Sequence, residues 1–286
     1  MRSSRPAISQ LAFLPGTSGE GPVVAAGFGG SGWVTLFSLD GDEPERRTLS
    51  VDGPVRALAA ARVGAEAPTI AVAAKTVRLL PPPEASSTES LPARIGPVRS
   101  LAFLTSAATA QGALLATGGA DGAIRLWDPF VPRHEFLPAL LGHRGKVGAL
   151  AVLPHPDRSH PLLISAGTDE TTIRVWDCLA GEEVLRLVTG APVTALAVQP
   201  PVATGQDSKT PTIVFREPEG HCRGRRPPVA RHVAEDPATA SEWRSLGAGG
   251  SPNIDPLSPC QRRHVDGFAV PGHLGGDAPV QPGVDQ

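Results

Sequence analysis

Three residues of this chain, His143, Ser165 and Asp169, are of the types that form the catalytic triad of a serine hydrolase. In such a triad the histidine takes the proton of the serine hydroxyl, and the acid orients the imidazole. The residues around Ser165 do not form the Gly-x-Ser-x-Gly turn that exposes a nucleophilic serine. All three residues also fall at regular positions of an internal repeat. We therefore favour a structural role for them and expect no catalytic residue.

A second candidate is the glycine-rich segment with Gly27, Gly29 and Gly32, which has the Gly-x-Gly-x-x-Gly spacing of a dinucleotide-binding loop. It follows an apolar run, and Asp52 lies at about the right distance for an acid that contacts the ribose. Such glycines open a helix, whose N-terminus holds the pyrophosphate. Residues 33–37 instead have the composition of a strand, and no lysine follows the glycines. The segment favours a turn between strands, with a nucleotide-binding enzyme as the alternative.

Metal and cofactor sites are not indicated. The cysteines are few and far apart in sequence: Cys178, Cys222 and Cys260. An odd, sparse set is neither a disulfide framework nor the paired spacing of a zinc site. His155 and His160, with Asp157 between them, lie in a segment that we expect to be a solvated loop rather than a set of metal ligands. We expect no metal and no cofactor.

The charge balance argues against a nucleic-acid-binding protein, and the absence of long apolar runs argues against a secreted or membrane protein. Lys plus Arg number 26 and Asp plus Glu 28, so nothing favours binding to nucleic acid or to an anionic membrane. The N-terminal residues lack the apolar core of a signal peptide, and no run is long enough to span a membrane. We expect a cytoplasmic protein. Abundant Ala, Gly and Pro, with far more Arg than Lys, suggest a high-GC genome and a bacterial source.

An internal repeat organises the chain. The pattern Ile/Val-x-x-Leu-Ala recurs at intervals of 43 to 49 residues and begins at Ile8, Val55, Val98, Val147 and Val193. Small apolar runs follow as expected second strands at 23–27, 69–74, 114–118 and 162–166. Alternating runs then predict third strands at 34–37, 76–80, 123–127 and 172–176. Outer strands are expected at 45–51, 90–95, 136–141 and 183–188. The pattern predicts an all-β fold without a helix of useful length.

The best-preserved copy, residues 142–177, opens on Gly-His and closes on Trp-Asp. It resembles a WD40 repeat, the unit of one β-propeller blade. The resemblance implies an arc over 7–215 in an incomplete ring, with four blades and part of a fifth. The expected blades are 7–51, 54–95, 97–141, 143–189 and the partial 192–215. Residues 216–286, rich in Pro, Gly and Arg, are expected to be a disordered tail.

WD40 blades hold a side-chain hydrogen-bond chain that runs from Trp to Ser or Thr, to His, to Asp. The resemblance assigns these roles to Trp176, Ser165, His143 and Asp169. The preceding repeat keeps three of the four, Thr117, Asp121 and Trp127, but has no histidine at the corresponding turn. The interval from Asp169 to Trp176 is one residue longer than that from Asp121 to Trp127, so the turn of the later repeat departs from the pattern.

The resemblance implies a non-catalytic scaffold that binds proteins or peptides through its propeller loops. A propeller hydrolase is a further alternative, which would need acids clustered at the central channel. An open arc would expose an apolar blade face at each end. We therefore expect a truncated propeller that is a fragment, or one that pairs with another copy or with a partner. The abrupt end of the repeat near residue 216 also motivates the hypothesis that the natural reading frame was lost there.

Overall fold

The fold is built from strands and turns. The computed structural model describes residues 7–16, 21–39, 45–62, 68–80, 89–91, 96–106, 109, 112–131, 135–154, 160–199, 211–217 and 222–225. Within these ranges there is no helix, and accordingly none that is long and apolar enough to cross a membrane. The all-β prediction is confirmed.

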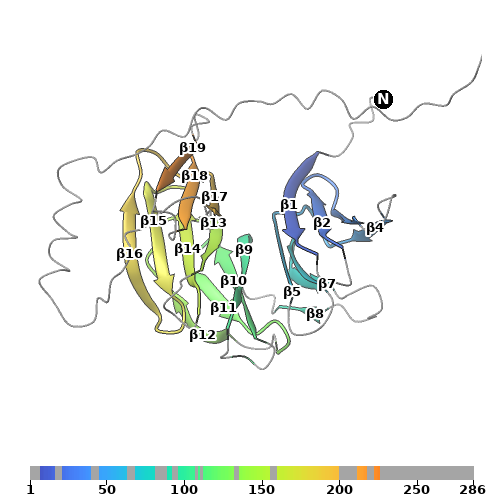
Figure 1. Ribbon diagram of the computed structural model, residues 1–286, viewed down its shortest axis with the longest axis horizontal. Helices are drawn as coiled ribbons and strands as arrows, with labels where there is room; N and C mark the ends of the chain where they lie inside the picture. Colours follow the sequence, from blue (N-terminus) through green and yellow to red (C-terminus); the bar gives the residue numbers. More distant parts are fainter. Residues whose placement is uncertain are drawn as a thin grey trace, which may run out of the picture.

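Five antiparallel sheets follow one another along the described chain, and we call them blades 1 to 5 (Figure 1). Blade 1 contains β1 (Ile8–Leu14), β2 (Val23–Phe28), β3 (Trp33–Ser38) and β4 (Glu45–Ser50). Blade 2 contains β5 (Ala57–Arg62), β6 (Pro68–Ala73), β7 (Val77–Leu80) and β8 (Glu89–Ser90). Blade 3 contains β9 (Val98–Thr105), β10 (Ala113–Gly119), β11 (Ile124–Trp127) and β12 (Glu135–Leu140). Blade 4 contains β13 (Val147–Leu153), β14 (Leu162–Gly167), β15 (Thr172–Asp177) and β16 (Glu182–Val188). Blade 5 contains β17 (Ala195–Gln199), β18 (Thr212–Arg216) and β19 (Cys222–Arg225).

Blade 5 extends further than the sequence predicted. Strand β19 pairs with β18, with Cys222 opposite Arg216, whereas the sequence pattern predicts repeats only to residue 215 and a disordered tail from residue 216. The Cys-Arg-Gly-Arg segment has no apolar alternation, so periodicity could not detect it. Backbone pairing along the open edge of β18 is what defines this strand. Residues 226–286, where the rest of the predicted tail falls, lie outside the described residues.

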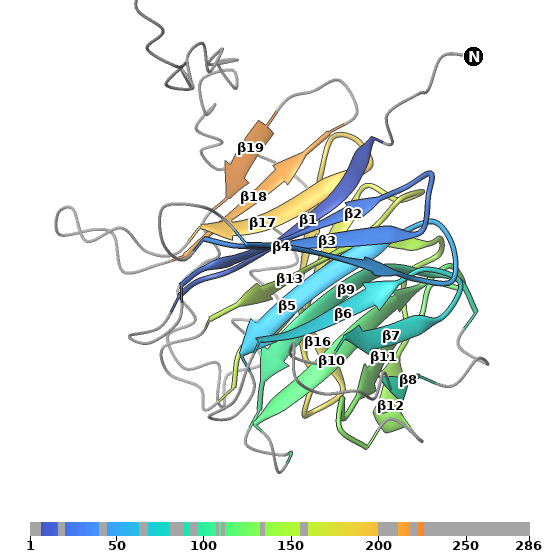
Figure 2. The same cartoon turned by 90° about the vertical axis from the view of Figure 1, so that its right-hand side faces the viewer.

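The blades form an open arc. Their first strands lie side by side in chain order, from β1 through β5, β9 and β13 to β17. Figure 1 shows blade 1 and blade 5 on opposite sides of the opening. Figure 2, viewed from the side of blades 1 and 2, shows the sheet of blade 2 layered on that of blade 3. The predicted incomplete ring of four blades and a partial fifth is confirmed.

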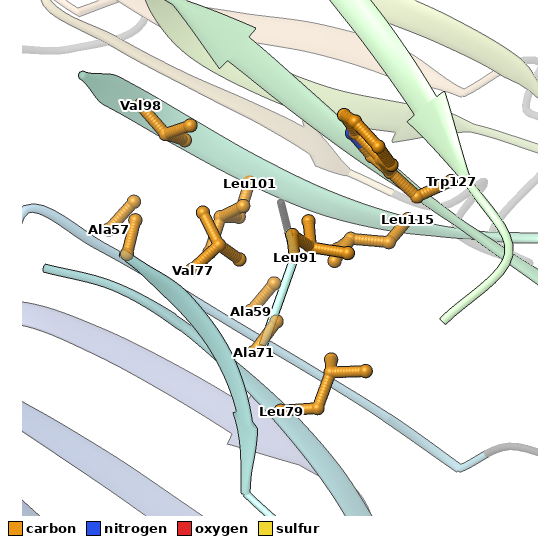
Figure 3. Packing of buried hydrophobic residues seen from close by; sticks show 11 residues of the cluster. Ala57, Ala59, Ala71, Val77, Leu79, Leu91, Val98, Leu101, Leu115 and Trp127 are labelled. Atoms are coloured by element: carbon orange, nitrogen blue, oxygen red, sulfur yellow. The ribbon is translucent and has the colours of Figure 1, made fainter. Parts of the chain in front are cut away.

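The hydrophobic core lies between successive blades. Each of the four blade pairs shares one buried apolar cluster. In the cluster between blades 2 and 3, Ala57, Ala59 and Val77 face Val98 and Leu101 (Figure 3). A blade in the middle of the arc is therefore covered on both faces, which explains why its second strand reads as a continuous apolar run rather than an alternating one.

Small residues on the second strands let the blades approach closely. A Cβ built at Gly27 would lie 2.5 Å from Val55 Cγ1 of blade 2, and one built at Gly118 would lie 2.8 Å from Val147 Cγ1 of blade 4. Hydrogen bonds cross the same interfaces, including one of 2.9 Å from Ser100 Oγ to the Val147 carbonyl oxygen. Val55 and Val147 thus each pack onto a glycine of the preceding blade.

Replacing Gly118 by alanine tests this close packing. The new Cβ would lie 2.2 Å from Ser100 Oγ, inside a well-packed interface. Overpacking of this kind costs about 1–3 kcal/mol, so Gly118→Ala should lower the free energy of unfolding in urea. Gly30→Ala is the control, because a Cβ at Gly30 meets nothing within 4 Å. Equal stability of the two variants would contradict the packing that we describe.

Candidate functional site

Blade 4 contains a network of buried, hydrogen-bonded side chains. His143 belongs to the connection between β12 and β13, Ser165 lies on β14 and Trp176 on β15. Trp176 Nε1 donates a hydrogen bond of 2.7 Å to Ser165 Oγ. His143 Nε2 lies 2.7 Å from the same oxygen. The structure therefore brings together three of the four residues that the resemblance assigned to this network.

The acid of the network is Glu170 and not Asp169. Glu170 Oε1 lies 3.0 Å from His143 Nδ1 and accepts a hydrogen bond from the Arg144 backbone N–H. Asp169 is exposed, and its carboxylate lies beside Gly145. The extra residue in this turn shifts the acid by one position, so that Glu170 stands at the same interval from Trp176 as Asp121 does from Trp127.

Charge and burial set the direction of the hydrogen bonds. Burial raises the pKa of Glu170, but hydrogen bonds from Thr172, the Arg144 backbone and His143 together outweigh it and leave this pKa below its usual value. Burial lowers the pKa of His143. An ionised carboxylate only accepts hydrogen bonds, so the neutral imidazole donates from Nδ1–H to Glu170 and accepts at Nε2 from the Ser165 hydroxyl. Every member is satisfied, and such a buried network fixes one conformation.

Ser165, His143 and Glu170 thus have the connectivity of a hydrolase triad, but the serine and the histidine are buried in the blade. Ser165 is 0% exposed, and the His143 side chain is likewise fully buried. The Trp176 indole N–H already occupies the serine oxygen. A substrate carbonyl has no access to this hydroxyl in the folded blade, so the network's role in this geometry is to hold strands and turns together.

Arg174 fixes the same turn from a second side. Its guanidinium donates a hydrogen bond of 2.6 Å to the Gly142 carbonyl oxygen and forms an ion pair with Glu183 of β16. Glu170 lies 3.7 Å away. The turn that precedes β13 is therefore anchored by His143 to β14 and by Arg174 to β15, which makes its backbone a rigid part of the blade.

Blade 3 carries a reduced version of this arrangement. Trp127 Nε1 donates a hydrogen bond of 3.0 Å to Thr117 Oγ1. Asp121 instead accepts a hydrogen bond of 2.7 Å from Arg125, and that bond lowers the pKa of the carboxyl. Trp127 therefore pairs with Thr117 and Asp121 with Arg125, so that Thr117, Asp121 and Trp127 do not form one side-chain network. The turn before β9 has Gly96 and Pro97 where blade 4 has its histidine.

The glycine-rich segment is a hairpin turn. Gly27 lies on β2 against Val55, and Gly32 has a φ of 60°, which glycine adopts readily. Strand β3 begins at Trp33, so no helix N-terminus follows to hold a pyrophosphate. The prediction of a turn rather than a nucleotide loop agrees with this local structure.

The described residues contain no cluster of candidate metal ligands. Within the described ranges no three His, Cys, Asp or Glu residues are grouped so that they could hold a metal ion. His160 Nε2 lies 2.9 Å from Asp177 Oδ1, while His155 and Asp157 lie outside the described residues. Burial raises the pKa of the Cys178 thiol to about 12, so this cysteine is a core residue and not a reactive thiolate.

Comparison with known proteins agrees with the blade geometry. The family described as "WD domain, G-beta repeat" matches residues 87–128 and 134–177. These two segments of the chain are WD40 repeats. Transducin beta-like protein 3 of Rattus norvegicus is 43% identical over 89 residues, which cover 29% of this chain and 10% of that protein. Nuclear distribution protein PAC1 of Gibberella zeae is 34% identical over 98 residues, which cover 33% of this chain and 20% of that protein.

Solved structures show the same fold at low sequence identity. The WD40 β-propeller domain of Doa1 has a TM-score of 0.53 at 15% identity, over 77% of this chain and 65% of that chain. A chain of the mitotic checkpoint complex has a TM-score of 0.51 at 19% identity, over 71% and 56%. BBS1N, solved in complex with ARL6DN, has a TM-score of 0.51 at 11% identity, over 71% and 60%. The chain spans only about a tenth of the length of transducin beta-like protein 3.

Alanine substitutions separate the two acids of the blade 4 turn. Glu170→Ala should lower the free energy of unfolding by about 1–3 kcal/mol, because it leaves the buried Nδ1–H of His143 without its acceptor. Asp169→Ala, at the exposed neighbouring position, should change it by no more than about 0.5 kcal/mol. Urea denaturation of both variants measures the difference. A larger loss of unfolding free energy for Asp169→Ala would show that Asp169, the residue assigned by the family resemblance, is the acid of the network.

The network also predicts how stability depends on pH. Because the pKa of His143 is lowered from 6.5 in the folded state, the unfolded chain takes up this proton first, and stability should fall as pH drops below about 6.5. Glu170, whose pKa is lowered from 4.5, adds a second loss as pH falls below that value. Urea denaturation across this range should show a shallower decline from pH 6.5 to 4.5 in His143→Gln than in the wild type. Parallel curves would show that His143 does not carry this linkage.

Proposed function

We propose that this WD40 protein is a non-catalytic scaffold that binds protein or peptide partners through its propeller loops. The observation that carries the proposal is the sealed network of blade 4, which uses Ser165 and His143 to fix a surface turn rather than to meet a substrate. Within the described residues no group of three or more His, Cys, Asp or Glu could hold a metal ion. The structural neighbours solved as the mitotic checkpoint complex and as BBS1N in complex with ARL6DN support protein binding as a use of this fold.

The connection between β12 and β13 is the loop best suited to binding. Leu141 is 71% exposed, and it precedes the turn whose Gly142 carbonyl is held by Arg174 and whose His143 is held by Ser165 and Glu170. Arg144 is exposed beside it. A large apolar side chain on a rigid backbone, with a flexible cation next to it, is a suitable anchor for a partner because little entropy is lost when the loop is bound.

The proposed partners are proteins and not nucleic acid or membranes. The formal net charge is −2, and exposed cations of the loops, such as Arg144, stand among exposed acids, such as Asp169. Such a mixed surface lacks the basic patch that phosphate backbones or anionic lipids attract. A cytoplasmic location remains part of the proposal.

Affinity capture with the full chain as bait tests the loop. Partners that bind through it should be lost from the captured set with Leu141→Asp, because the charge removes the apolar anchor. They should be retained with Val184→Asp, which alters an exposed valine on the outer strand of the same blade. Quantitative mass spectrometry of the three captures gives the comparison. Captured proteins that are unchanged by Leu141→Asp would refute binding through this loop.

A further inference from the structure

The first strand of blade 1 exposes apolar residues whose equivalents in later blades are buried. In blades 2 to 5 the repeat's first valine packs against the preceding blade and is buried: Val55, Val98, Val147 and Val193 are 2%, 3%, 0% and 1% exposed. The equivalent residue of blade 1, Ile8, is 56% exposed. Leu11 is 65% exposed, whereas the equivalent Leu58 and Leu101 are 8% and 7% exposed.

These residues belong to one apolar sheet surface, which we call the blade 1 face and define by Ile8, Leu11, Phe13 and Trp33. The strand register puts Leu11 opposite Ala26 and Phe13 opposite Val24 on β2, and Trp33 of β3 opposite Phe28 on the same side. Phe13 and Trp33 are also exposed. Concentrated exposed apolar surface of this kind marks an interaction site.

The other end of the arc is not the complement of this face. Its outward positions on β17 are Ala195, Ala197 and Gln199, which are exposed and either small or polar. Arg216 lies opposite Ala195, in the register position that Ala166 holds opposite Ala149 in blade 4. Gly118 holds this position in blade 3, where it contacts the valine of the next blade. If blade 5 of one copy packed on blade 1 of a second copy, Arg216 would occupy the space that Ile8 needs. Glycine or alanine at this position leaves that space open.

We propose that the blade 1 face docks a WD40-type blade of another protein, whose second strand presents glycine or alanine to Ile8, and that Arg216 prevents blade 5 of a second copy from taking that place. The proposed contact follows the interfaces between blades of this chain. At those interfaces an apolar first strand packs against small residues of the preceding blade. Head-to-tail contact between copies does not close on itself in general and leads to filaments. A polar, bulky residue at one end of a repeat array stops such growth.

The full chain itself provides the probe, because Arg216→Ala gives blade 5 the small residue that the partner is proposed to carry. In sedimentation velocity, wild type should remain monomeric with rising concentration. Arg216→Ala should show a sedimentation coefficient that rises with concentration. A second substitution on the blade 1 face, Leu11→Asp or Phe13→Asp, should abolish that rise. Arg186→Ala, which removes an exposed arginine from the outer strand of blade 4, is the matched control and should behave as wild type.

Three outcomes would overturn the inference: wild type that self-associates as Arg216→Ala does, Arg216→Ala that stays monomeric, or association that survives both blade 1 substitutions. Circular dichroism of each variant confirms that it is folded, and two alternative blade 1 substitutions guard against a local defect. The inference rests on the proposed scaffold function. Its failure is nevertheless distinguishable from that of the loop proposal, since self-association of the pure chain does not depend on Leu141 or on captured proteins.

Discussion

The close packing of one blade face on the next is the interaction on which the rest of this structure depends. A four-stranded sheet by itself buries little, but here the first valines of blades 2 to 5 are buried in the clusters between blades. Val147, for example, packs against Gly118 of the preceding blade. Fully buried side chains such as Leu115 and Leu163 lie in these interfaces, and each contributes about 1.5–3 kcal/mol by its burial. Stability therefore accumulates between neighbours, as in other repeat proteins.

Polar contacts then determine the shape of the surface that the stacked blades present. In blade 4 the hydrogen-bond chain from Trp176 to Glu170 joins β14, β15 and the turns beside them, and Arg174 of β15 also anchors the Gly142 carbonyl. Blade 3, without a histidine, ties its tryptophan only to Thr117. A loop that is rigid before binding loses less entropy when a partner docks, so the network that buries Ser165 suits the proposed use of this loop in binding.

The repeat period and the apolar runs were sufficient to predict the all-β arc, because both arise from the stacking of sheets covered on two faces. The acid of the network was one residue away from its predicted place. Counting back from Trp176 by the interval that separates Asp121 from Trp127 would have found Glu170. Strand β19 could not be predicted, because its Cys-Arg-Gly-Arg segment has no apolar period and forms through backbone pairing with β18. The position of Arg216 opposite Ala195 likewise depends on strand register, which the sequence pattern does not specify.

Native-state hydrogen exchange, followed strand by strand in the full chain, tests most directly the claim that each blade is stabilised by its neighbours. The account predicts that the amides of β10 and β14, in blades covered on both faces, exchange most slowly. Those of β1, with the exposed Leu11 and Phe13, should exchange faster although β1 is hydrogen-bonded to β2 along its length. Equal protection of β1 and β14 would show that the sheets are stable individually, and would contradict the account.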